Sequence, residues 1–405
     1  MWLYNLGISL YAGGIRLAAL WHGKARLWSE GRRNIFERME AAVRPSDRIV
    51  WVHAASLGEF EQARPIIERL RAEHPEYKIL LTFFSPSGYE IRKNYEGADY
   101  VFYLPADTPS NARRFLDIVH PEIAIFIKYE FWINLLSELR RRKVRSYIVS
   151  AIFRRNSVFF RPYGAMWRQA LETFDTLFVQ NVESKRLLSE IGFDNVVVAG
   201  DTRFDRVAQI AAAAQRVETI ERFRGGGRLF VAGSTWGPDE EILLPLVNAN
   251  PDVKFVIAPH EMDEGRIAHL MRNAKGGAVR YTQCDAATRF DDVQVLVLDT
   301  MGMLSSVYGS ATWAYVGGGF GVGIHNTLEA ATFGLPIAFG PNYGKFKEAR
   351  DMVSLGCAVS VRTAGELAAW FAPLCDDEET LRRASRTAKD YTARNQGAPG
   401  IILRS

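Results

Sequence analysis

Two glutamates follow apolar runs at positions where a carboxylate could take a proton from a substrate. Glu59 lies in the stretch HAASLGE, after the run Ile49–His53, and Glu130 lies in KYEFW, after Ile123–Ile127. A carboxylate at the edge of a sheet can act as a general base for an attacking hydroxyl. Two carboxylates close together raise the pKa of one of them towards neutral pH. Glu59 is therefore a candidate general base, and Glu130 a second acidic group near the same cleft.

Helix capping is the competing interpretation of both glutamates. Ser56 and Glu59 have the three-residue spacing of a capping box, with Gly58 between them. Glu130 would complement the positive end of a helix that begins beside it. The spacing alone does not choose between the two interpretations.

A glycine-rich stretch between Trp313 and Pro341 could bind a nucleotide. Glycines after a strand let the backbone approach a ligand, and a helix that follows offers free N–H groups to an anion. Two polar residues three apart on that helix share a face and could bond the hydroxyls of a ribose. The alternative is an ordinary strand–helix turn with surface polar residues. The candidate contacts are Gly318, Gly319, His325, Asn326 and Glu329.

Other loops after apolar runs carry further candidates. Arg203 in GDTRFD could hold a phosphate, or could form an inter-domain ion pair with Asp201 or Asp205. Ser234 and Thr235 begin a turn of the kind that cradles anions. The remaining two candidates are His260, which could equally be a surface residue, and Gly302 in DTMG.

The elements that must position these residues alternate along the chain. Apolar runs of strand length alternate with amphipathic segments, which predicts parallel sheets covered on both faces. The expected strands are 49–53, 79–84, 100–104, 123–127, 145–150, 176–179, 196–199, 228–232, 254–258, 293–298, 313–316 and 336–339. The expected helices of the first half are 59–73, 111–119 and 131–142. Ligands of such sheets lie beyond the carboxyl ends of the strands.

Composition limits the functional classes. The chain has 405 residues, enough for two domains, and its formal charge of +4 gives no reason to expect a nucleic-acid partner. Its three cysteines form no CxxC pair, which favours a reducing compartment. No metal-binding motif occurs, so we expect no metal. The basic run from Arg140 to Arg145 is either a solvated helix end or, if it faces the edge of Glu59, an anion-binding surface.

The N-terminus predicts contact with a membrane surface. Residues 1–15 carry no charged side chain, and Trp2, Tyr4, Tyr11 and Trp21 are aromatics of the kind found at lipid headgroups. Basic residues follow at Lys24, Arg26, Arg32 and Arg33, where anionic lipid would attract them. No secretory signal is expected. The alternatives are a helix lying in the membrane interface and an apolar helix packed on the protein itself.

Several motifs together resemble one enzyme family. HAASLGEFEQARPII, KYEFW, GDTRFD, GSTW, DTMG and VGGGFGVGIHNTLEAATFGLPIAFGP occur in one order over nearly the whole chain. In this order they are similar to the Kdo transferases, the 3-deoxy-D-manno-octulosonic-acid transferases of lipopolysaccharide assembly. The combination of SLGEF with HNxLE is specific, whereas either motif alone would be weak.

The resemblance implies a function and a set of roles. It implies a CMP-Kdo donor, the tetraacyl precursor of lipid A (lipid IVA) as the acceptor, no cofactor, and an inverting reaction. Glu59 would be the catalytic base, Glu130 would match the second conserved glutamate, and Asn326 and Glu329 would bind the cytidine ribose. The chain departs from the family pattern at Arg203, at Met303 after DTMG, and around His260.

The expected fold class is α/β of the GT-B type, with two Rossmann-like parallel-sheet domains facing a cleft and an N-terminal membrane-associated helix. The expected parts are residues 1–40 for that helical segment, 41–206 for the acceptor domain and 207–405 for the CMP-Kdo domain with a C-terminal helix. The expected location is the cytoplasmic face of the inner membrane, as a monotopic protein or through a single N-terminal helix. Two rival functions stay open: a GT-B enzyme that uses a UDP-sugar, as a UDP-GlcNAc transferase or epimerase, and a non-catalytic nucleotide-binding protein of the membrane surface.

Overall fold

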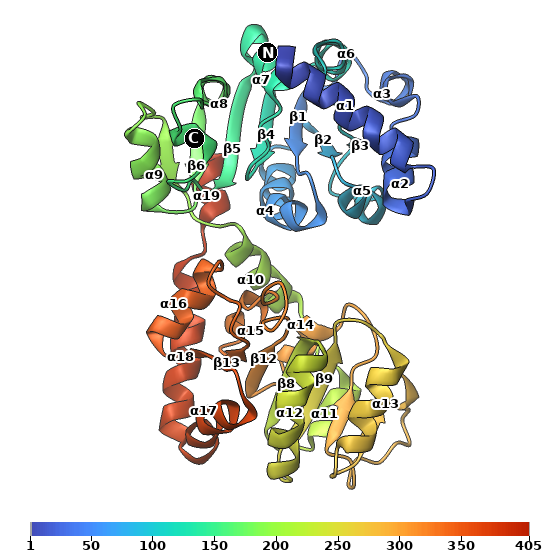
Figure 1. Ribbon diagram of the computed structural model, residues 1–405, viewed down its shortest axis with the longest axis vertical. Helices are drawn as coiled ribbons and strands as arrows, with labels where there is room; N and C mark the ends of the chain where they lie inside the picture. The colour runs from blue at the N-terminus through green and yellow to red at the C-terminus, as the bar shows by residue number, and fades with distance from the viewer. Residues whose placement is uncertain (1, 405) are drawn as a thin grey trace. The chain divides into compact units, whose positions relative to one another are not determined.

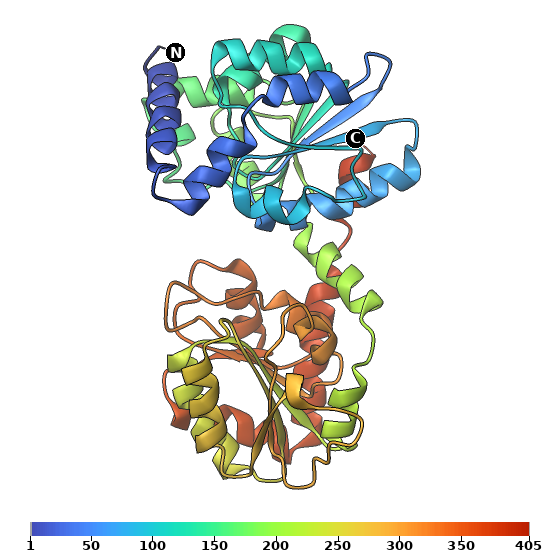
Figure 2. The ribbon, with the colours of Figure 1, turned by 90° about the vertical axis from the view of Figure 1, so that its right-hand side faces the viewer.

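The computed structural model describes residues 2–404, which form two compact units (Figure 1). The first unit contains Met1–Arg206 and Gln396–Ser405, and the second contains Val207–Asn395. Each unit is a seven-stranded sheet with helices on both of its faces (Figure 2). The prediction of two α/β units with parallel sheets is confirmed.

The first sheet has the strand order β3-β2-β1-β4-β5-β6-β7, and every neighbouring pair is parallel. Its strands are β1 (Ile49–His53), β2 (Lys78–Phe83), β3 (Tyr100–Tyr103), β4 (Ile123–Ile127), β5 (Arg145–Ala151), β6 (Thr176–Val179) and β7 (Val196–Val198). The helices of this unit are α1 (Trp2–Ala18), α2 (Gly23–Gly31), α3 (Ile35–Ala42), α4 (Leu57–Glu73), α5 (Pro86–Arg92), α6 (Pro109–Val119), α7 (Ile133–Arg142), η1 (Val158–Phe160), α8 (Ala165–Leu171), α9 (Val182–Ser189) and α19 (Ala398–Leu403).

The second sheet has the order β10-β11-β9-β8-β12-β13-β14 and is also parallel throughout. Its strands are β8 (Leu229–Thr235), β9 (Lys254–Pro259), β10 (Ala278–Arg280), β11 (Val295–Val297), β12 (Trp313–Val316), β13 (Ile337–Phe339) and β14 (Ala358–Ser360). The helices are α10 (Arg203–Ala213, which begins in the first unit), α11 (Glu218–Arg224), α12 (Gly237–Ala249), α13 (Glu264–Asn273), η2 (Tyr281–Gln283), α14 (Leu304–Tyr308), α15 (Leu328–Thr332), α16 (Lys347–Leu355), α17 (Ala364–Asp376) and α18 (Glu378–Arg394).

Side-chain alternation divides each core into two layers. On β1, Trp51 packs with the helices α3, α6 and α7 on one face, while Val50 and Val52 pack with α4 on the other. All five residues of β1 are buried. A strand buried on both faces has a continuous apolar sequence, which explains why the central strands were recognisable as apolar runs.

The structure corrects three sequence-based assignments. Strands β10 and β14 were not predicted, because each has only three residues and neither stands out as an apolar run. The C-terminal segment was expected in the second domain, but Gln396–Ser405 belongs to the first unit. There Ile402 packs into the layer beneath α4, and the Asp205 carboxylate accepts a hydrogen bond from the Gly397 N–H at 2.8 Å.

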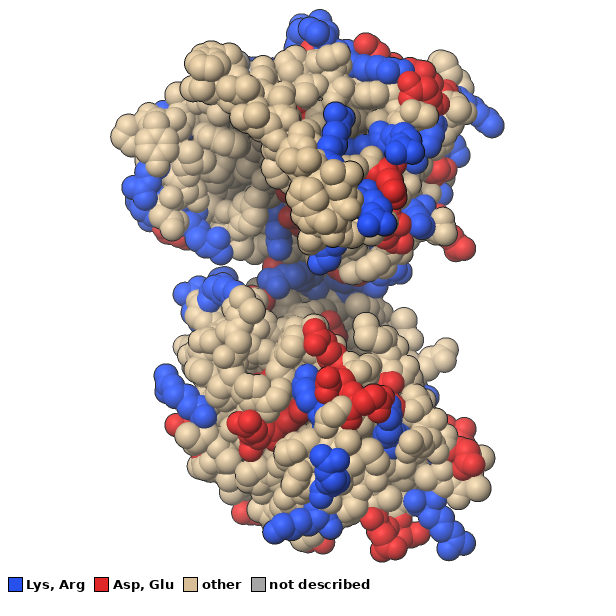
Figure 3. Space-filling model, turned by 45° about the vertical axis from the view of Figure 1, so that its right-hand side comes forward, with Lys and Arg blue, Asp and Glu red and all other residues tan. Residues whose placement is uncertain are grey.

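The basic run Arg140–Arg145 forms a solvated, ion-paired helix end. Arg140 pairs with Glu172, and Arg142 pairs with Asp117 and Glu138. The run joins the end of α7 to the start of β5, so it lies at the amino edge of the sheet, opposite the edge that follows β1. Its proposed role as an anion surface beside Glu59 is therefore wrong. Other Lys and Arg side chains gather on the face of the first unit drawn in Figure 3, with fewer acidic ones among them.

No helix among residues 2–404 is long and apolar enough to cross a membrane. Helix α1 instead exposes large apolar side chains. They lie at three-, four- and seven-residue intervals along one side of the helix, at Leu3, Leu6, Leu10 and Leu17, which are 50–67% exposed.

Asp107 holds the opposite side of α1 against the first unit. Its buried carboxylate accepts hydrogen bonds from the Tyr4 hydroxyl at 2.6 Å and from the backbone N–H groups of Asn134 and Leu135 at 2.9 Å each. Those two N–H groups belong to the first turn of α7, whose own N-cap residue, Trp132, supplies no side-chain bond. A remote carboxylate therefore caps this helix, where unpaired N–H groups would otherwise be buried.

We expect Asp107→Ala to lower the free energy of unfolding by about 3 kcal/mol, because it leaves buried donors of α7 without an acceptor. Asp117→Ala is the matched control, since Asp117 is exposed and loses only a surface ion pair worth about 0.5 kcal/mol. Urea unfolding followed by tryptophan fluorescence measures both. Equal, small losses in the two variants would contradict the capping role.

Candidate active site

The first candidate site lies where the strand order of the first sheet reverses. From β1 the chain continues outward to β2 and β3 on one side, and β4 begins the series on the other side. Side chains that follow β1 and β4 therefore meet at the crevice where parallel sheets bind ligands. Glu59 follows β1, and Glu130 follows β4. The strand order thus brings the two predicted carboxylates to one place.

Glu59 occupies the first turn of α4 and reaches back to the loop before it. Its Oε2 accepts a hydrogen bond from the Ala55 N–H at 2.6 Å. The Ser56 side chain forms no capping bond, so only half of the predicted capping box exists. A side-chain carbon placed on Gly58 would meet no atom within 4 Å, so the helix start beside Glu59 is open.

Glu59 is held in an environment that favours its protonated form. Burial and, after it, the negative charge of Glu130 raise the pKa of Glu59, which lies at about 7 once all its neighbours are included. The bonds from the Ala55 and Ser56 N–H groups and the charge of Lys128 lower the pKa in part. A carboxylate with a pKa near 7 is suited to take up a proton at neutral pH.

Glu130 lies in the loop before α7 and not at the start of the helix, which begins three residues later at Ile133. The expectation that it complements a helix terminus is therefore wrong. Its Oε2 accepts a hydrogen bond from the Trp132 indole at 2.8 Å and lies 3.1 Å from the His53 Nε2. The Glu130 side chain is 12% exposed, so Trp132 and His53 hold its carboxylate where little water reaches it.

His53 is a residue that sequence reasoning missed. Its side chain is fully buried, and Nδ1 lies 2.8 Å from the Thr82 hydroxyl, which accepts a bond from the Trp51 indole at 2.8 Å. If the Thr82 hydroxyl donates to His53 Nδ1, then His53 Nε2 carries the hydrogen and donates to Glu130. Every polar group in this series of hydrogen bonds then has a partner. A histidine that ends a buried strand next to the HAASLGE loop was the available signal.

Lys128 was also not singled out. It has a left-handed backbone, with φ of 63°, and its N–H donates to the Val149 carbonyl at 2.8 Å. A non-glycine residue in this conformation is uncommon and marks a constrained turn. The turn places a positive charge near Glu59, in the same loop as Glu130.

Arg203 begins α10 at the carboxyl edge of the first sheet. Its guanidinium pairs with the Asp201 carboxylate at 2.7 Å, and its N–H donates to the same carboxylate at 2.9 Å. Both residues belong to the first unit, so this is not the inter-domain ion pair considered from the sequence. The role of Arg203 towards a phosphate stays a prediction.

The second candidate site lies at the corresponding reversal of the second sheet, between β8 and β12. Ser234, near the end of β8, has a left-handed backbone with φ of 54°. The Thr235 hydroxyl is buried and donates to Glu240 at 2.9 Å. Thr235 therefore stabilises the start of α12, while Ser234 shapes the turn after β8.

The glycines after β12 are required by protein packing. A side-chain carbon on Gly318 would lie 2.7 Å from the Gly323 carbonyl, and one on Gly319 would lie 2.6 Å from Gly340. Gly318 also has a φ of 90° and donates its N–H to the buried Asp239 carboxylate at 2.9 Å. Asp239 accepts a second bond from the Tyr315 hydroxyl at 2.7 Å, so one carboxylate joins the loop after β12 to α12.

Three aromatic rings line this second edge. His260 and His325 stack with their ring centroids 4.3 Å apart, and the Trp236 ring lies 4.8 Å from His260. The Trp236 indole donates to the His325 Nε2 at 3.2 Å. Burial, with the neighbouring His260, lowers the pKa of His325. His260 itself is exposed, so the stack presents one open histidine face.

Asn326 and Glu329 are bonded to each other, but they do not share a helix. Helix α15 begins at Leu328, after Asn326, and has only five residues. The Asn326 amide donates to Glu329 at 2.9 Å, and the other Glu329 oxygen accepts from Ser305 of α14 at 3.1 Å. The polar pair therefore exists, through a turn and a side-chain bond in place of a helix face. Gly302, with φ of 85°, precedes α14 and is open on its side-chain position.

No group of three or more His, Cys, Asp or Glu side chains within residues 2–404 is placed to hold a metal ion. The titratable side chains gathered at the first site are the two carboxylates of Glu59 and Glu130, with His53 and Lys128 beside them.

Known proteins of one enzyme family are similar to this chain over most of its length. Residues 32–206, which include the Glu59 and Glu130 loops, match the family described as 3-deoxy-D-manno-octulosonic-acid transferase (kdotransferase). The enzyme of that name from Haemophilus influenzae is 25% identical over 378 residues, which is 89% of this chain and 86% of the relative. The Bordetella pertussis enzyme is 28% identical over 365 residues, 86% and 84% of the two chains.

The chain is a glycosyltransferase whose sequence is similar to the Kdo transferases over most of its length. Among solved structures, the UDP-GlcNAc 2-epimerase of Neisseria meningitidis covers 88% of this chain and 98% of its own, with a TM-score of 0.63 and 15% identity. At that identity the likeness concerns the fold alone. The expected α/β fold of the GT-B type with two parallel-sheet domains is confirmed, and the membrane association of the N-terminal helix stays a prediction. The fold is shared between an epimerase and this transferase, so the chemistry must lie in the loops.

The burial of Glu59 should make the protein lose stability as the pH rises. The pKa of Glu59 is about 7 in the folded protein and about 4.5 in an unfolded chain, so the folded state binds the proton more tightly. The free energy of unfolding therefore falls as the pH rises from about 4.5 to about 7. Glu59→Gln removes this titration. The variant should therefore be more stable than the wild type at pH 8, by about 1–3 kcal/mol, and nearly equal at pH 4.5.

Urea unfolding at the two pH values measures this difference. Glu68→Gln, on the same helix but in an i,i+4 pair with Arg64, is the control, because it removes a carboxylate and leaves Glu59 in place. An unchanged wild-type–variant difference across the pH range would contradict the elevated pKa.

Proposed function

We propose that this protein moves Kdo from CMP-Kdo to the tetraacyl disaccharide precursor of lipid A, with Glu59 as the general base. The observation that carries the proposal is the pair Glu59 and Glu130 at the strand-order reversal of the first sheet, with the pKa of Glu59 at about 7. The names of the relatives support Kdo as the group that is transferred.

In this proposal the first unit activates the acceptor. Glu59 takes the proton from the attacking sugar hydroxyl as the oxygen becomes nucleophilic. His53 and Trp132 hold Glu130 in place, and the negative charge of Glu130 keeps Glu59 basic enough to accept the proton. Attack by the hydroxyl from the side opposite the departing CMP inverts the anomeric carbon through an oxocarbenium-like transition state.

The second unit binds the nucleotide in this proposal. Asn326 and Glu329 bond the ribose hydroxyls, and the turn at Ser234 and the histidine stack lie where phosphate and base would be held. Arg203 stabilises charge on the departing phosphate. Because Arg203 is already paired with Asp201, it would share its positive charge between the two anions.

We expect Glu59→Gln to lower kcat/KM for Kdo transfer by about 10²–10⁴-fold, the usual effect of removing a general base. Purified protein is mixed with CMP-Kdo, generated in situ, and the lipid A precursor, and the products are read by mass spectrometry. Glu68→Gln should transfer Kdo at the wild-type rate, since its ion pair lies outside the site.

Near-normal transfer by a folded Glu59→Gln protein would show that Glu59 is not the general base. If the wild type adds no Kdo mass, thermal stabilisation by CMP compared with UMP and UDP decides between this donor and the rival UDP-sugar.

We also propose that the enzyme rests on the cytoplasmic face of the inner membrane through α1. The exposed leucines of α1 form one apolar side, and Trp2 and Trp21 near its two ends are 71% and 69% exposed. Such a helix is suited to lie in the interface between headgroups and acyl chains. The basic residues of α2 and the following turn add attraction to anionic lipid.

The double substitution Leu10→Glu with Leu17→Glu should lower the partition of the protein onto anionic phospholipid vesicles by at least about tenfold, because two apolar side chains no longer enter the bilayer. Val182→Glu is the control, since Val182 is equally exposed but lies on α9. Co-sedimentation with vesicles measures the partition. Equal binding by all three proteins would contradict the role of α1.

A further inference from the structure

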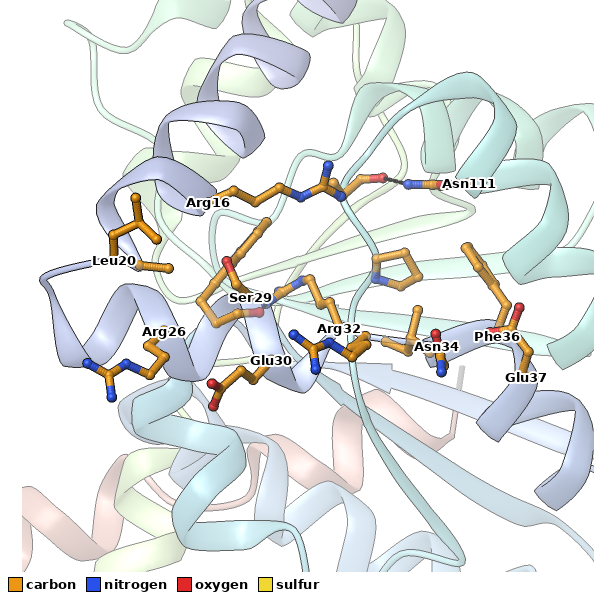
Figure 4. Close-up of a pocket in the computed structure, with 16 residues that line it drawn as sticks. Arg16, Leu20, Arg26, Ser29, Glu30, Arg32, Asn34, Phe36, Glu37 and Asn111 are labelled. Atoms are coloured by element: carbon orange, nitrogen blue, oxygen red, sulfur yellow. Dashed lines mark hydrogen bonds between the residues drawn. The ribbon is translucent and has the colours of Figure 1, made fainter.

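A cavity of about 880 Å³ lies in the first unit beside the N-terminal helices (Figure 4). Its walls come from the end of α1, from α2 and the turn that follows, from the start of α3, and from the segment after β3 into α6. That last segment begins at the carboxyl edge of the sheet, the same edge at which Glu59 and Glu130 lie. The site described above does not use this cavity.

The cavity has an excess of positive charge. Arg16, Arg26, Arg32 and Arg33 line it, against two glutamates, of which Glu37 is paired with Arg114. Within residues 2–404 none of these four arginines has a carboxylate at ion-pair distance. Figure 4 shows Arg16 on one side of the cavity and Arg26, Glu30 and Arg32 on the other. Unpaired guanidinium groups that face one space favour an anion between them.

Arg32 is the fixed member of this group. It donates to the carbonyl oxygens of Leu104 and Phe84 at 2.8 Å each, and its guanidinium carbon lies 3.9 Å from the centre of the Trp28 ring. Burial lowers the pKa of Arg32 to about 9. Burying a guanidinium without a counter-charge is costly, so a bound anion would offset that cost.

A ligand with several acceptor oxygens would accept hydrogen bonds from the free guanidinium N–H groups that line this cavity, and a phosphate is such a ligand.

The cavity also adjoins the candidate base. The Phe84 ring, whose backbone carbonyl holds Arg32, lies 4.6 Å from the Trp132 ring, and the Trp132 indole donates to Glu130. Leu20, in the turn after α1, also lines the cavity and is 73% exposed. A ligand here would have a phosphate between a lipid part and a reacting sugar.

We propose that this cavity binds a phosphate group of the glycolipid acceptor and so positions the sugar hydroxyl near Glu59. The inference rests on the proposed function. We assign the acceptor, and not a bilayer phospholipid, because Arg32 is anchored to the segments after β2 and β3, at the same sheet edge as Glu130. A bilayer phospholipid could bind through the exposed arginines alone, without Arg32.

The test compares two acceptors in neutral detergent micelles, where no bilayer is present. One is the phosphorylated lipid A precursor, and the other is the same molecule after enzymatic removal of its phosphates. The variant Arg16→Gln with Arg33→Gln removes two exposed charges that hold no ion pair, so its fold should be retained. The control is Arg44→Gln, because Arg44 is exposed and precedes β1 at the opposite edge of the sheet.

For the double variant we expect KM for the phosphorylated acceptor to rise about tenfold, with kcat within about twofold of wild type. KM for the dephosphorylated acceptor should be the same in both proteins, and Arg44→Gln should change neither value. An equal rise with both acceptors would mean a structural role, and no change would mean that no phosphate binds. Unchanged KM with weaker binding to anionic vesicles would assign the cavity to bilayer phospholipid. Each of these three results overturns the proposal.

A binding measurement distinguishes a failure of the proposed function from a failure of the phosphate-site proposal. If the wild type transfers no Kdo to either acceptor, equilibrium binding of the phosphorylated glycolipid is measured in the same micelles without donor. About tenfold weaker binding by the double variant then supports the phosphate site, and equal binding overturns it.

Discussion

Parallel strand pairing is the constraint on which the rest of this structure depends. Because every strand of a sheet runs in the same direction, all of their carboxyl ends lie along one edge, and the loops that follow them are neighbours. The strand order then selects which loops meet at the centre. In the first sheet the reversal lies between β1 and β4, and in the second between β8 and β12. Residues about seventy positions apart, such as Glu59 and Glu130, interact for this reason.

The first unit holds its carboxylates in an environment that does not favour folding. Glu59 is buried near a second negative charge, and Glu130 is held by a buried histidine and an indole. Two like charges in a poorly solvated crevice destabilise the folded chain at high pH. The same arrangement brings the pKa of Glu59 to the range in which a general base is useful. Stability and reactivity therefore have opposite requirements at this position.

In the second unit, two features of the glycine-rich stretch occur at the predicted positions, but their structural cause differs from the one predicted. The glycines after β12 were interpreted as room for a ligand, yet Gly318 and Gly319 are in contact with protein backbone, where a side chain would not fit. Asn326 and Glu329 were placed on one helix face, yet a turn and a direct bond bring them together. Both features depend on tertiary packing: the loop after β12 lies against Gly340 after β13, and Ser305 of α14 bonds Glu329 of α15.

The sequence by itself determined the fold class, most strand positions and the two loops that carry the carboxylates, because strands buried on both faces must be apolar throughout and loops after them must be polar. It could not determine strand order, since that depends on which apolar runs pair across long stretches of chain. Only the tertiary structure therefore identified His53 as a partner of Glu130, returned the C-terminal segment to the first unit, and brought the arginines of α1 and α2 together around one cavity.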